Sequence, residues 1–438
     1  MGLKVAKFGG SSVADVIQLA KIKDIIMSDE EKRYIVVSAP GKRFAQDSKI
    51  TDLLYSCMMH KENNIPYDQL FQVICDRFKA VEVNLGVDAD LNREFEIIKN
   101  AIEEGTTADY LASRGEFLNA KIIAAYLGYD FVDAAGIVLF DKKGRFLEEE
   151  TNEALKAELE KHERALLPGF YGTKPDGSIK TFSRGGSDIT GALVARAVGA
   201  DVYENWTDVS GFLVADPRII DDPKPIGEVS YKELRELSYM GASVLHEDAI
   251  FPARKANIPI NIRNTNKPED AGTFIVENST GKDDRVVTGI AGHKGFTVIA
   301  LQKHRLTAER GFIRRMAGIL EDLDISMEHM PSGIDNVSIV IANDQLKDKL
   351  DDLIEEFERQ LQPDSLEIIE DMAIIATVGQ GMAYRKGVSA KLFTALAEND
   401  VNIRMIDQGS SEINIIVGVE GKDFEKAVKA IYGAFVAD

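Results

Sequence analysis

The sequence predicts an α/β protein in which a three-layer αβα domain with a mostly parallel open sheet precedes two small α+β modules. Over roughly the first 290 residues, short apolar runs alternate with amphipathic stretches, and such alternation produces a parallel sheet with helices on both faces. After about residue 295 the chain contains an internal repeat, which indicates a duplicated module. A chain of 438 residues is long enough for two or three domains.

The first domain is expected to span residues 1–290. Apolar runs predict strands at 3–8, 34–39, 130–134 and 200–206. The spacing of apolar residues predicts helices at Val13–Met27, Phe117–Leu127 and Ile189–Val198. Ligands of open parallel sheets bind at the carboxyl ends of the strands. The polar segments that follow these strands are therefore the candidate sites.

The repeat pairs "GFIRRMAGILEDLDISMEHMPSGIDNVSIVI" with "GVSAKLFTALAENDVNIRMIDQGSSEINIIV" without a gap. Gly311 falls on Gly387, 76 positions later, and Val337 falls on Ile413 at the same offset. Each copy has the pattern of a helix, a strand, a glycine-containing turn and a second strand. We expect the copies to occupy residues 291–365 and 366–438, with a possible exchange of strands between them.

Composition excludes several classes of function. The net charge is −20 and no basic run could follow a phosphate backbone, so neither nucleic acid nor an anionic membrane is an expected partner. No segment approaches the length of apolar sequence that crosses a bilayer. Cys57 and Cys75 are the only cysteines, which is typical of a reducing compartment. We therefore expect a cytoplasmic protein.

The segment "KFGGSS" ends the first predicted strand with Lys7, Gly9, Gly10, Ser11 and Ser12. Glycines let backbone N–H groups approach phosphate oxygens, the following helix adds its positive end, and the lysine adds a full charge. This pattern favours a phosphate-binding loop. The alternative is a strand-to-helix turn whose serines cap the helix.

A second glycine cluster, "SRGGSD", precedes another predicted helix. Arg184, Gly185, Gly186 and Ser187 are candidates to bind an anion, and Asp188 is a candidate to hold Mg²⁺ or to orient a lysine. The alternative is that Ser187 or Asp188 only caps a helix that begins at Ile189.

Three weaker signals accompany these loops. "ASRGEFLNA" places Glu116 at the expected start of a helix, where the helix dipole stabilises a carboxylate even without a function. "NWTDVSGFLVADPR" places polar residues in turns after a strand, and "NTNKPEDAGT" places Lys267 in a loop, where a lysine is more often only solvated. The polar residues of the longer segment are Thr207, Asp208, Asp216 and Arg218.

Together these segments resemble the aspartate kinases of the amino acid kinase family over the whole chain. "KFGGSS", "SRGGSD", "WTDVSG" and "ADPR" match motifs of that family in order and spacing, and the doubled module resembles its tandem ferredoxin-like ACT domains. The resemblance implies transfer of the ATP γ-phosphoryl group to the side-chain carboxylate of L-aspartate, with Mg²⁺. A carboxylate nucleophile has a pKa near 3.9, so it needs no general base at neutral pH.

The resemblance also implies roles for individual residues. It assigns catalysis to Lys7 and Asp188 and aspartate binding to Ser38, Thr51, Glu116 and Arg184. It assigns the binding of ATP to Lys7, Gly9, Gly10, Ser11, Ser12, Gly186, Ser187, Thr207, Asp208, Asp216, Arg218 and Lys267. Leu213 departs from the family, because many members place an aromatic residue there beside the adenine.

The ACT resemblance implies an amino-acid effector, for which lysine is our prediction, and a homodimer or a dimer of dimers. In the first repeat the implied effector residues are Gly311, Phe312, Ile313, Ser332, Gly333 and Asp335. Three alternatives stay open: modules that serve dimerisation alone, a kinase that resembles acetylglutamate kinase, and a non-catalytic amino-acid sensor.

Overall fold

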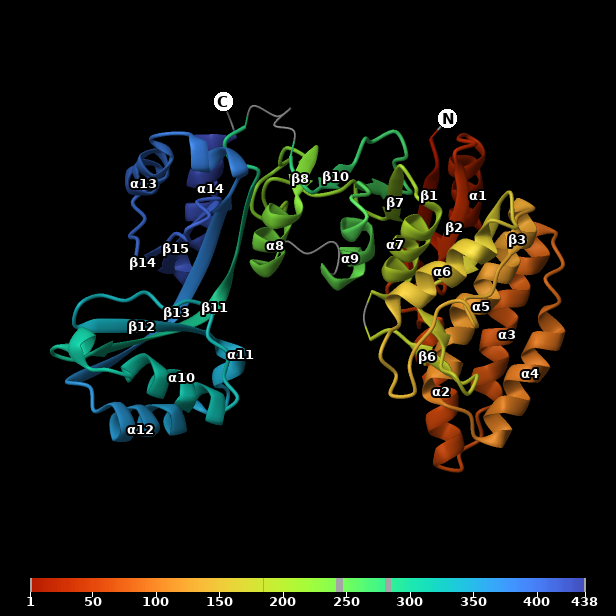
Figure 1. The fold of residues 1–438 in the computed structure, drawn as a ribbon, viewed down its shortest axis with the longest axis horizontal. Coiled ribbons are helices and arrows are strands. Elements are labelled where there is room, and N and C mark those ends of the chain that lie inside the picture. The colour runs from red at the N-terminus through yellow and green to blue at the C-terminus, as the bar shows by residue number, and fades with distance from the viewer. Residues whose placement is uncertain (1, 184, 242–246, 280–284, 437–438) are drawn as a thin grey trace. The chain divides into compact units, whose positions relative to one another are not determined.

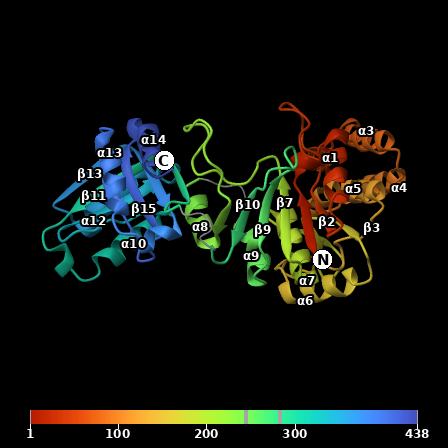
Figure 2. The same cartoon turned by 90° about the horizontal axis from the view of Figure 1, so that it is seen from above.

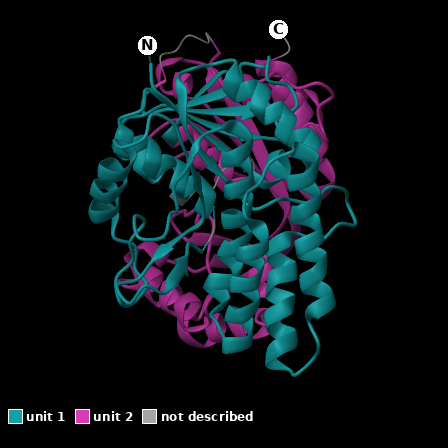
Figure 3. Ribbon diagram, turned by 90° about the vertical axis from the view of Figure 1, so that its right-hand side faces the viewer, with its two compact units in different colours: residues 1–212, 227–231, 244–278 teal, residues 213–226, 232–243, 279–438 magenta. Residues whose placement is uncertain are grey.

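The computed structural model describes residues 2–183, 185–241, 247–279 and 285–436 (Figure 1). The chain forms two compact units (Figure 3). Unit 1 consists of residues 1–212, 227–231 and 244–278, and unit 2 consists of residues 213–226, 232–243 and 279–438. Within the described ranges, no helix combines the length and the apolar composition that crossing a bilayer requires.

Unit 1 is built on an eight-stranded sheet with the order β3-β4-β2-β1-β7-β9-β10-β8. All neighbouring strands are parallel except β9 and β10, so the predicted mostly parallel open sheet is confirmed. The strands are β1 (Lys4–Phe8), β2 (Lys32–Val37), β3 (Asp130–Phe131), β4 (Ala165–Pro168), β7 (Val202–Thr207), β8 (Glu228–Ser230), β9 (Ile260–Asn264) and β10 (Thr273–Val276), beside a separate hairpin of β5 (Tyr171–Thr173) and β6 (Ile179–Thr181).

Helices cover both faces of this sheet (Figure 2). One face carries α1 (Val16–Met27), α3 (Asp68–Leu85), α4 (Leu91–Glu104) and α5 (Ala108–Leu127), with α2 (Ile50–Glu62) packed against α3 and α5. The other face carries α6 (Glu148–Leu159), α7 (Gly186–Val198) and α9 (Glu247–Lys255).

Alternation along the strands decides which side chains meet which helices. Phe8 and Trp206 belong to the core shared with α1 and α5. Their strand neighbours Lys7 and Asn205 therefore lie on the opposite face, against α7. On β1 and β7, the face toward α1 and α5 therefore packs in the core, and the face toward α7 carries polar side chains.

Three predicted helix starts were wrong, two of them by three residues and one by nine. The helix predicted from Val13 begins at Val16, after a 3-10 turn at Gly10–Val13, because the Asp15 carboxylate accepts a hydrogen bond of 2.9 Å from Gln18 N. The helix predicted from Phe117 begins at Ala108, where Thr107 is the N-cap. α7 begins at Gly186 rather than at Ile189.

Unit 2 contains a five-stranded sheet with the order β12-β11-β13-β15-β14, in which all neighbours are antiparallel. Its strands are β11 (Gly289–Gln302), β12 (Asn336–Ala342), β13 (Ser365–Val378), β14 (Met405–Asp407) and β15 (Asn414–Glu420). Its helices are α8 (Tyr231–Tyr239, from its second residue), α10 (Phe312–Asp322), α11 (Asn343–Leu346), α12 (Leu350–Leu361), α13 (Val388–Glu398) and α14 (Phe424–Phe435).

The predicted duplication is visible in these boundaries. β11 and β13 begin and end 76 positions apart, as do α10 and α13. β11 pairs with β13 along nearly its whole length, from Gly289 opposite Val378 to Gln302 opposite Ser365. The two copies therefore share one continuous sheet.

One segment of unit 2 comes from the middle of the chain. Residues 213–226 leave unit 1 after Phe212 and return to it at Gly227. Ala215 and Ile220 are buried in the same apolar cluster as Phe424 of α14. Lys224 N also donates a hydrogen bond of 3.0 Å to the hydroxyl of Tyr432. This segment is therefore an integral part of the core of unit 2.

Candidate active site

Lys7 and Asp188, the two predicted catalytic residues, meet on the α7 face of the sheet. The Lys7 side chain is 8% exposed, and its Nζ lies 2.5 Å from Oδ1 of Asp188 in the first turn of α7. Asn205 stands beside Lys7 on the neighbouring strand and donates a hydrogen bond of 2.7 Å from Nδ2 to the same oxygen. Two donors therefore fix the Asp188 carboxylate against the ammonium group. Sequence reasoning missed Asn205, whose only signal was a polar residue within an apolar strand.

The glycines after β1 form a close backbone contact with the loop that follows β2. Gly9 N donates a hydrogen bond of 2.9 Å to Trp206 O, and Gly41 N donates one of 2.8 Å to Gly10 O. A Cβ atom on Gly41 would lie 2.7 Å from the carbonyl carbon of Gly10. The phosphate-loop candidate therefore keeps its shape only while position 41 has no side chain, a requirement that sequence reasoning missed.

We expect Gly41→Ala to lower the free energy of unfolding by about 1–3 kcal/mol, because the added methyl group overpacks this contact. The apparent KM for ATP should rise while the KM for aspartate changes less. Thermal unfolding and steady-state kinetics test this. Gly433→Ala in α14 is the matched control, because its added Cβ would meet no atom within 4 Å beyond its chain neighbours and its own helix backbone. Equal unfolding temperatures for the two variants would contradict the prediction.

The two serines of the first loop differ in environment. Ser12 is buried, and its Oγ lies 2.7 Å from Oγ1 of Thr265, which follows β9. Ser11 is exposed. The hydroxyl of Ser12 therefore ties the loop to the end of β9, whereas Ser11 is accessible to a ligand.

Glu116 is a buried carboxyl group on α5. The residue is 6% exposed, and its Oε2 has no hydrogen-bond partner among the described residues. Burial raises the pKa of this carboxyl to about 8, although a backbone hydrogen bond from Ala39 acts in the opposite direction. The expectation that Glu116 begins a helix was wrong, because α5 begins at Ala108. The charge of Arg114 also lowers this pKa, but Glu116 forms no ion pair among the described residues. A buried carboxyl of this kind is suited to bind a cationic group of a ligand.

Three predicted aspartate-binding residues come from elements that converge at Gly115. A Cβ atom on Gly115 would lie 2.9 Å from the Cβ of Ala39 and 3.3 Å from Ile50. Ser38 precedes Ala39, Thr51 follows Ile50, and Glu116 follows Gly115. Ser38 is held further by its carbonyl, which accepts a hydrogen bond of 2.8 Å from Asn119 Nδ2. The fourth residue of this set, Arg184, lies outside the described residues.

The predicted ATP-binding residues divide between the two units. In unit 1, Gly186 and Ser187 form the buried first turn of α7, and Thr207 ends β7, with exposed Asp208 after it. Lys267 is exposed in the turn after β9. Asp216 and Arg218 belong to unit 2, where they form an ion pair of 2.6 Å with each other, and the Arg218 side chain is 88% exposed.

The predicted effector residues lie in two places of the first repeat, at the start of α10 and in the turn before β12. Gly311 is the N-cap of α10, with a φ of 81°, and Ile313 is partly exposed. Phe312 is 1% exposed within the apolar core, so its side chain serves packing. Ser332 and Gly333 are exposed in the turn before β12, whereas Asp335 Oδ1 accepts a hydrogen bond of 2.8 Å from Arg305 N.

Comparison with known proteins places this arrangement in a family. The model of the amino acid kinase family matches residues 2–264, and an ACT domain model matches residues 375–435. Aspartokinase 3 of Bacillus subtilis is 37% identical over 450 aligned positions, which cover 99% of each chain. The chain belongs to the aspartokinases. The resemblance to aspartate kinases that the sequence motifs indicated is therefore confirmed for this aspartokinase.

Solved structures agree with this assignment. The aspartate kinase of Clostridium acetobutylicum is 54% identical to this aspartokinase and superimposes with a TM-score of 0.94, over 99% of this chain and 100% of that chain. Aspartokinase III of E. coli, solved in complex with lysine and aspartate, is 25% identical and gives a TM-score of 0.76 over 99% of each chain. The likeness thus extends across both units of this aspartokinase.

Proposed function

We propose that this protein transfers the γ-phosphoryl group of ATP to the side-chain carboxylate of L-aspartate and thereby forms 4-phospho-L-aspartate. Full-length similarity to aspartokinases supports this activity, together with regulation through ACT domains. The structural observation that carries the proposal is the Lys7 and Asp188 pair beside the Gly9 and Gly10 backbone, at the carboxyl end of a central parallel strand.

The chemistry needs positive charge more than it needs a base. Aspartate is ionised at neutral pH, so the main barrier is the approach of one anion to another. Lys7, the backbone amides of the glycine loop and the first turn of α7 would supply positive charge to the phosphates. Glu116 would pair with the α-ammonium group of aspartate, and we retain Arg184 as the partner of its α-carboxylate.

Magnesium fits this site as a companion of ATP rather than as a resident ion. Among the described residues, no group of three or more His, Cys, Asp or Glu side chains could hold a metal. Mg²⁺ is commonly held by one or two carboxylates together with substrate phosphates, and Asp188 would supply such a carboxylate. Bound there, Mg²⁺ would neutralise charge on the phosphates.

The remaining assignments are part of the same proposal. Ser38 and Thr51 would position aspartate, and Ser11, Ser12, Thr207, Asp208, Asp216, Arg218 and Lys267 would line the nucleotide. Residues 1–290 would be catalytic, with the ACT modules at 291–365 and 366–438. We expect the modules to bind lysine and the protein to be a cytoplasmic homodimer or dimer of dimers.

A coupled assay of ADP release tests the activity and the effector. We expect ADP release to require aspartate, to be absent with N-acetylglutamate, and to fall when millimolar lysine is added. An effector works only by binding one conformational state more tightly than another. Turnover with N-acetylglutamate alone would favour the acetylglutamate kinase alternative. Lysine binding without any turnover would favour a non-catalytic sensor. Activity unaffected by millimolar lysine would remove lysine as the effector.

A further inference from the structure

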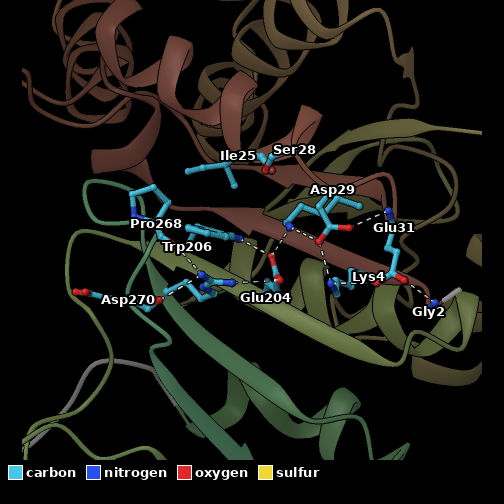
Figure 4. A network of polar contacts seen from close by, with 12 residues as sticks. Gly2, Lys4, Ile25, Ser28, Asp29, Glu31, Glu204, Trp206, Pro268 and Asp270 are labelled. Carbon is cyan, nitrogen blue, oxygen red and sulfur yellow. Dashed lines mark hydrogen bonds and ion pairs between the residues drawn. The ribbon is translucent and has the colours of Figure 1, made fainter.

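Unit 1 contains a cavity on the face of the sheet opposite to Lys7. Glu204 and Trp206 alternate with Asn205 along β7 and therefore lie on the α1 side. Between α1 and the strands β7 and β9 the structure has an open cavity of about 350 Å³. Figure 4 shows part of its wall and the polar network beneath it. It is lined by Lys21, Asp24, Ile25, Ser28, Lys32, Trp206, Arg263, Thr265, Asn266 and Pro268.

Cations dominate this lining, although the chain as a whole is strongly acidic. Three cationic side chains and one carboxylate line the cavity. Lys32 and Arg263 have a counter-charge behind the wall, because the buried carboxylate of Glu204 lies 3.6 Å from Lys32 and 3.9 Å from Arg263. Asp29 also lies behind the wall, 2.6 Å from Lys32. These carboxylates let Lys32 and Arg263 remain partly buried, so Lys21 is the lining cation that has no carboxylate partner among the described residues.

Two of the donors have capacity left for a ligand. The ammonium group of Lys21 contacts the amide oxygen of Asn266 at 2.8 Å, and no carboxylate among the described residues forms an ion pair with it. Nε of Arg263 is buried and has no hydrogen-bond partner within the described part of the chain. That atom is enclosed by protein, so a ligand in the cavity would contact the accessible part of the Arg263 side chain, which is 21% exposed and whose Nη1 lies 3.9 Å from Glu204.

The cavity is larger than a bare inorganic ion requires, and part of its wall is apolar. Trp206, which is 1% exposed, lies under the Arg263 guanidinium at 4.7 Å, and Ile25 and Pro268 complete the apolar part. We propose that this cavity is a binding site for a small organic anion that carries phosphate or carboxylate groups. Its carbon skeleton contacts Ile25 and Pro268 beside Trp206, and its charged group binds Lys21 and Arg263.

The site is distinct from the proposed nucleotide site but adjoins it. Gly9 N donates to Trp206 O at 2.9 Å, and Thr265 hydrogen-bonds to Ser12. Both links connect the cavity wall to the glycine loop. Binding is therefore measured without turnover, so that failure of the site and failure of the proposed kinase activity are separate results.

The single tryptophan of the chain, Trp206, makes the test direct. The full-length protein, with ADP and Mg²⁺ at saturation to fill the nucleotide site, is titrated with glycerol 3-phosphate, citrate or inorganic phosphate while tryptophan fluorescence is recorded. We expect a saturable change with glycerol 3-phosphate or citrate, and the stronger of the two identifies the charged group. No saturable change with either, or binding of inorganic phosphate as tight as theirs, would overturn the proposal.

Lys21→Gln tests whether the response comes from this cavity. Loss of its charge should weaken binding of the better probe about five- to tenfold. Lys23→Gln is the matched control two residues along α1, where Lys23 contacts Tyr126 instead, and it should bind like the unmodified protein. Thermal unfolding confirms that both variants fold. Equal affinities for Lys21→Gln and Lys23→Gln would contradict the assignment.

Discussion

Replacing Lys7 with methionine is expected to lower kcat about 10³-fold, since removal of one pre-positioned charge from a phosphoryl-transfer site costs that order of rate. The fold should persist, because Asp188 keeps its hydrogen bond of 2.7 Å from Asn205. The KM for aspartate should change far less than kcat. Steady-state kinetics with an ADP-coupled readout, beside a thermal unfolding curve, measures all three quantities.

Lys4→Met is the matched control on the same strand. Lys4 lies three residues before Lys7 and forms ion pairs with Asp29 at 2.8 Å and Glu31 at 3.0 Å, away from the proposed site. It should leave kcat nearly unchanged. If Lys7→Met kept kcat within tenfold of the unmodified enzyme, Lys7 would have no catalytic role.

Glu116→Gln is expected to raise the KM for aspartate about 10²-fold, the order that a lost buried charge pairing costs. Most mutations that abolish binding at a buried site also destabilise the protein, but this one should not. The variant removes a carboxyl that burial disfavours in its ionised form. Its unfolding temperature should therefore equal or exceed that of the unmodified enzyme. A fall in unfolding temperature together with an unchanged KM would refute both parts.

The same carboxyl predicts a pH dependence. Its pKa is about 8 in the free enzyme, so it is mostly protonated at pH 7, and pairing with an ammonium group requires the carboxylate. The KM for aspartate should fall as pH rises from 6 to 8 and then level off, and Glu116→Gln should lack this dependence. The opposite trend applies to stability. Because the folded-state pKa lies above the reference value of 4.5, the contribution of Glu116 to the free energy of unfolding declines as pH rises between these values.

The sequence predicted those residues of the site that belong to local motifs. Lys7 lies near the end of a predicted strand and Asp188 directly precedes a predicted helix, and both belong to segments with glycines. The predicted fold class also predicted that the two segments meet, because parallel strands present their carboxyl ends at one edge of the sheet. Asn205 and Gly41 were not predictable in this way. Asn205 matters through the register of β1 with β7, and Gly41 matters through a contact with Gly10 across two loops, and neither relation is local in sequence.

Boundaries were less predictable than elements, for a related reason. The apolar periodicity of α5 is clear only from Phe117, because residues 108–116 contain Asp109, Arg114 and Glu116, which look solvent-exposed. In the structure Arg114 is buried between the rings of Tyr110 and Phe117, at 4.6 and 4.4 Å. When charged residues are buried for packing or function, they interrupt the apolar periodicity from which a helix is predicted.

The excursion of residues 213–226 has a consequence for how this enzyme can be dissected. A truncated protein that ends near residue 290 would retain Ala215 and Ile220 but lose Phe424 and the rest of the apolar cluster that buries them. Those side chains would then face water and promote aggregation. A single cut near residue 290 therefore does not separate two intact units, because unit 2 includes residues 213–226.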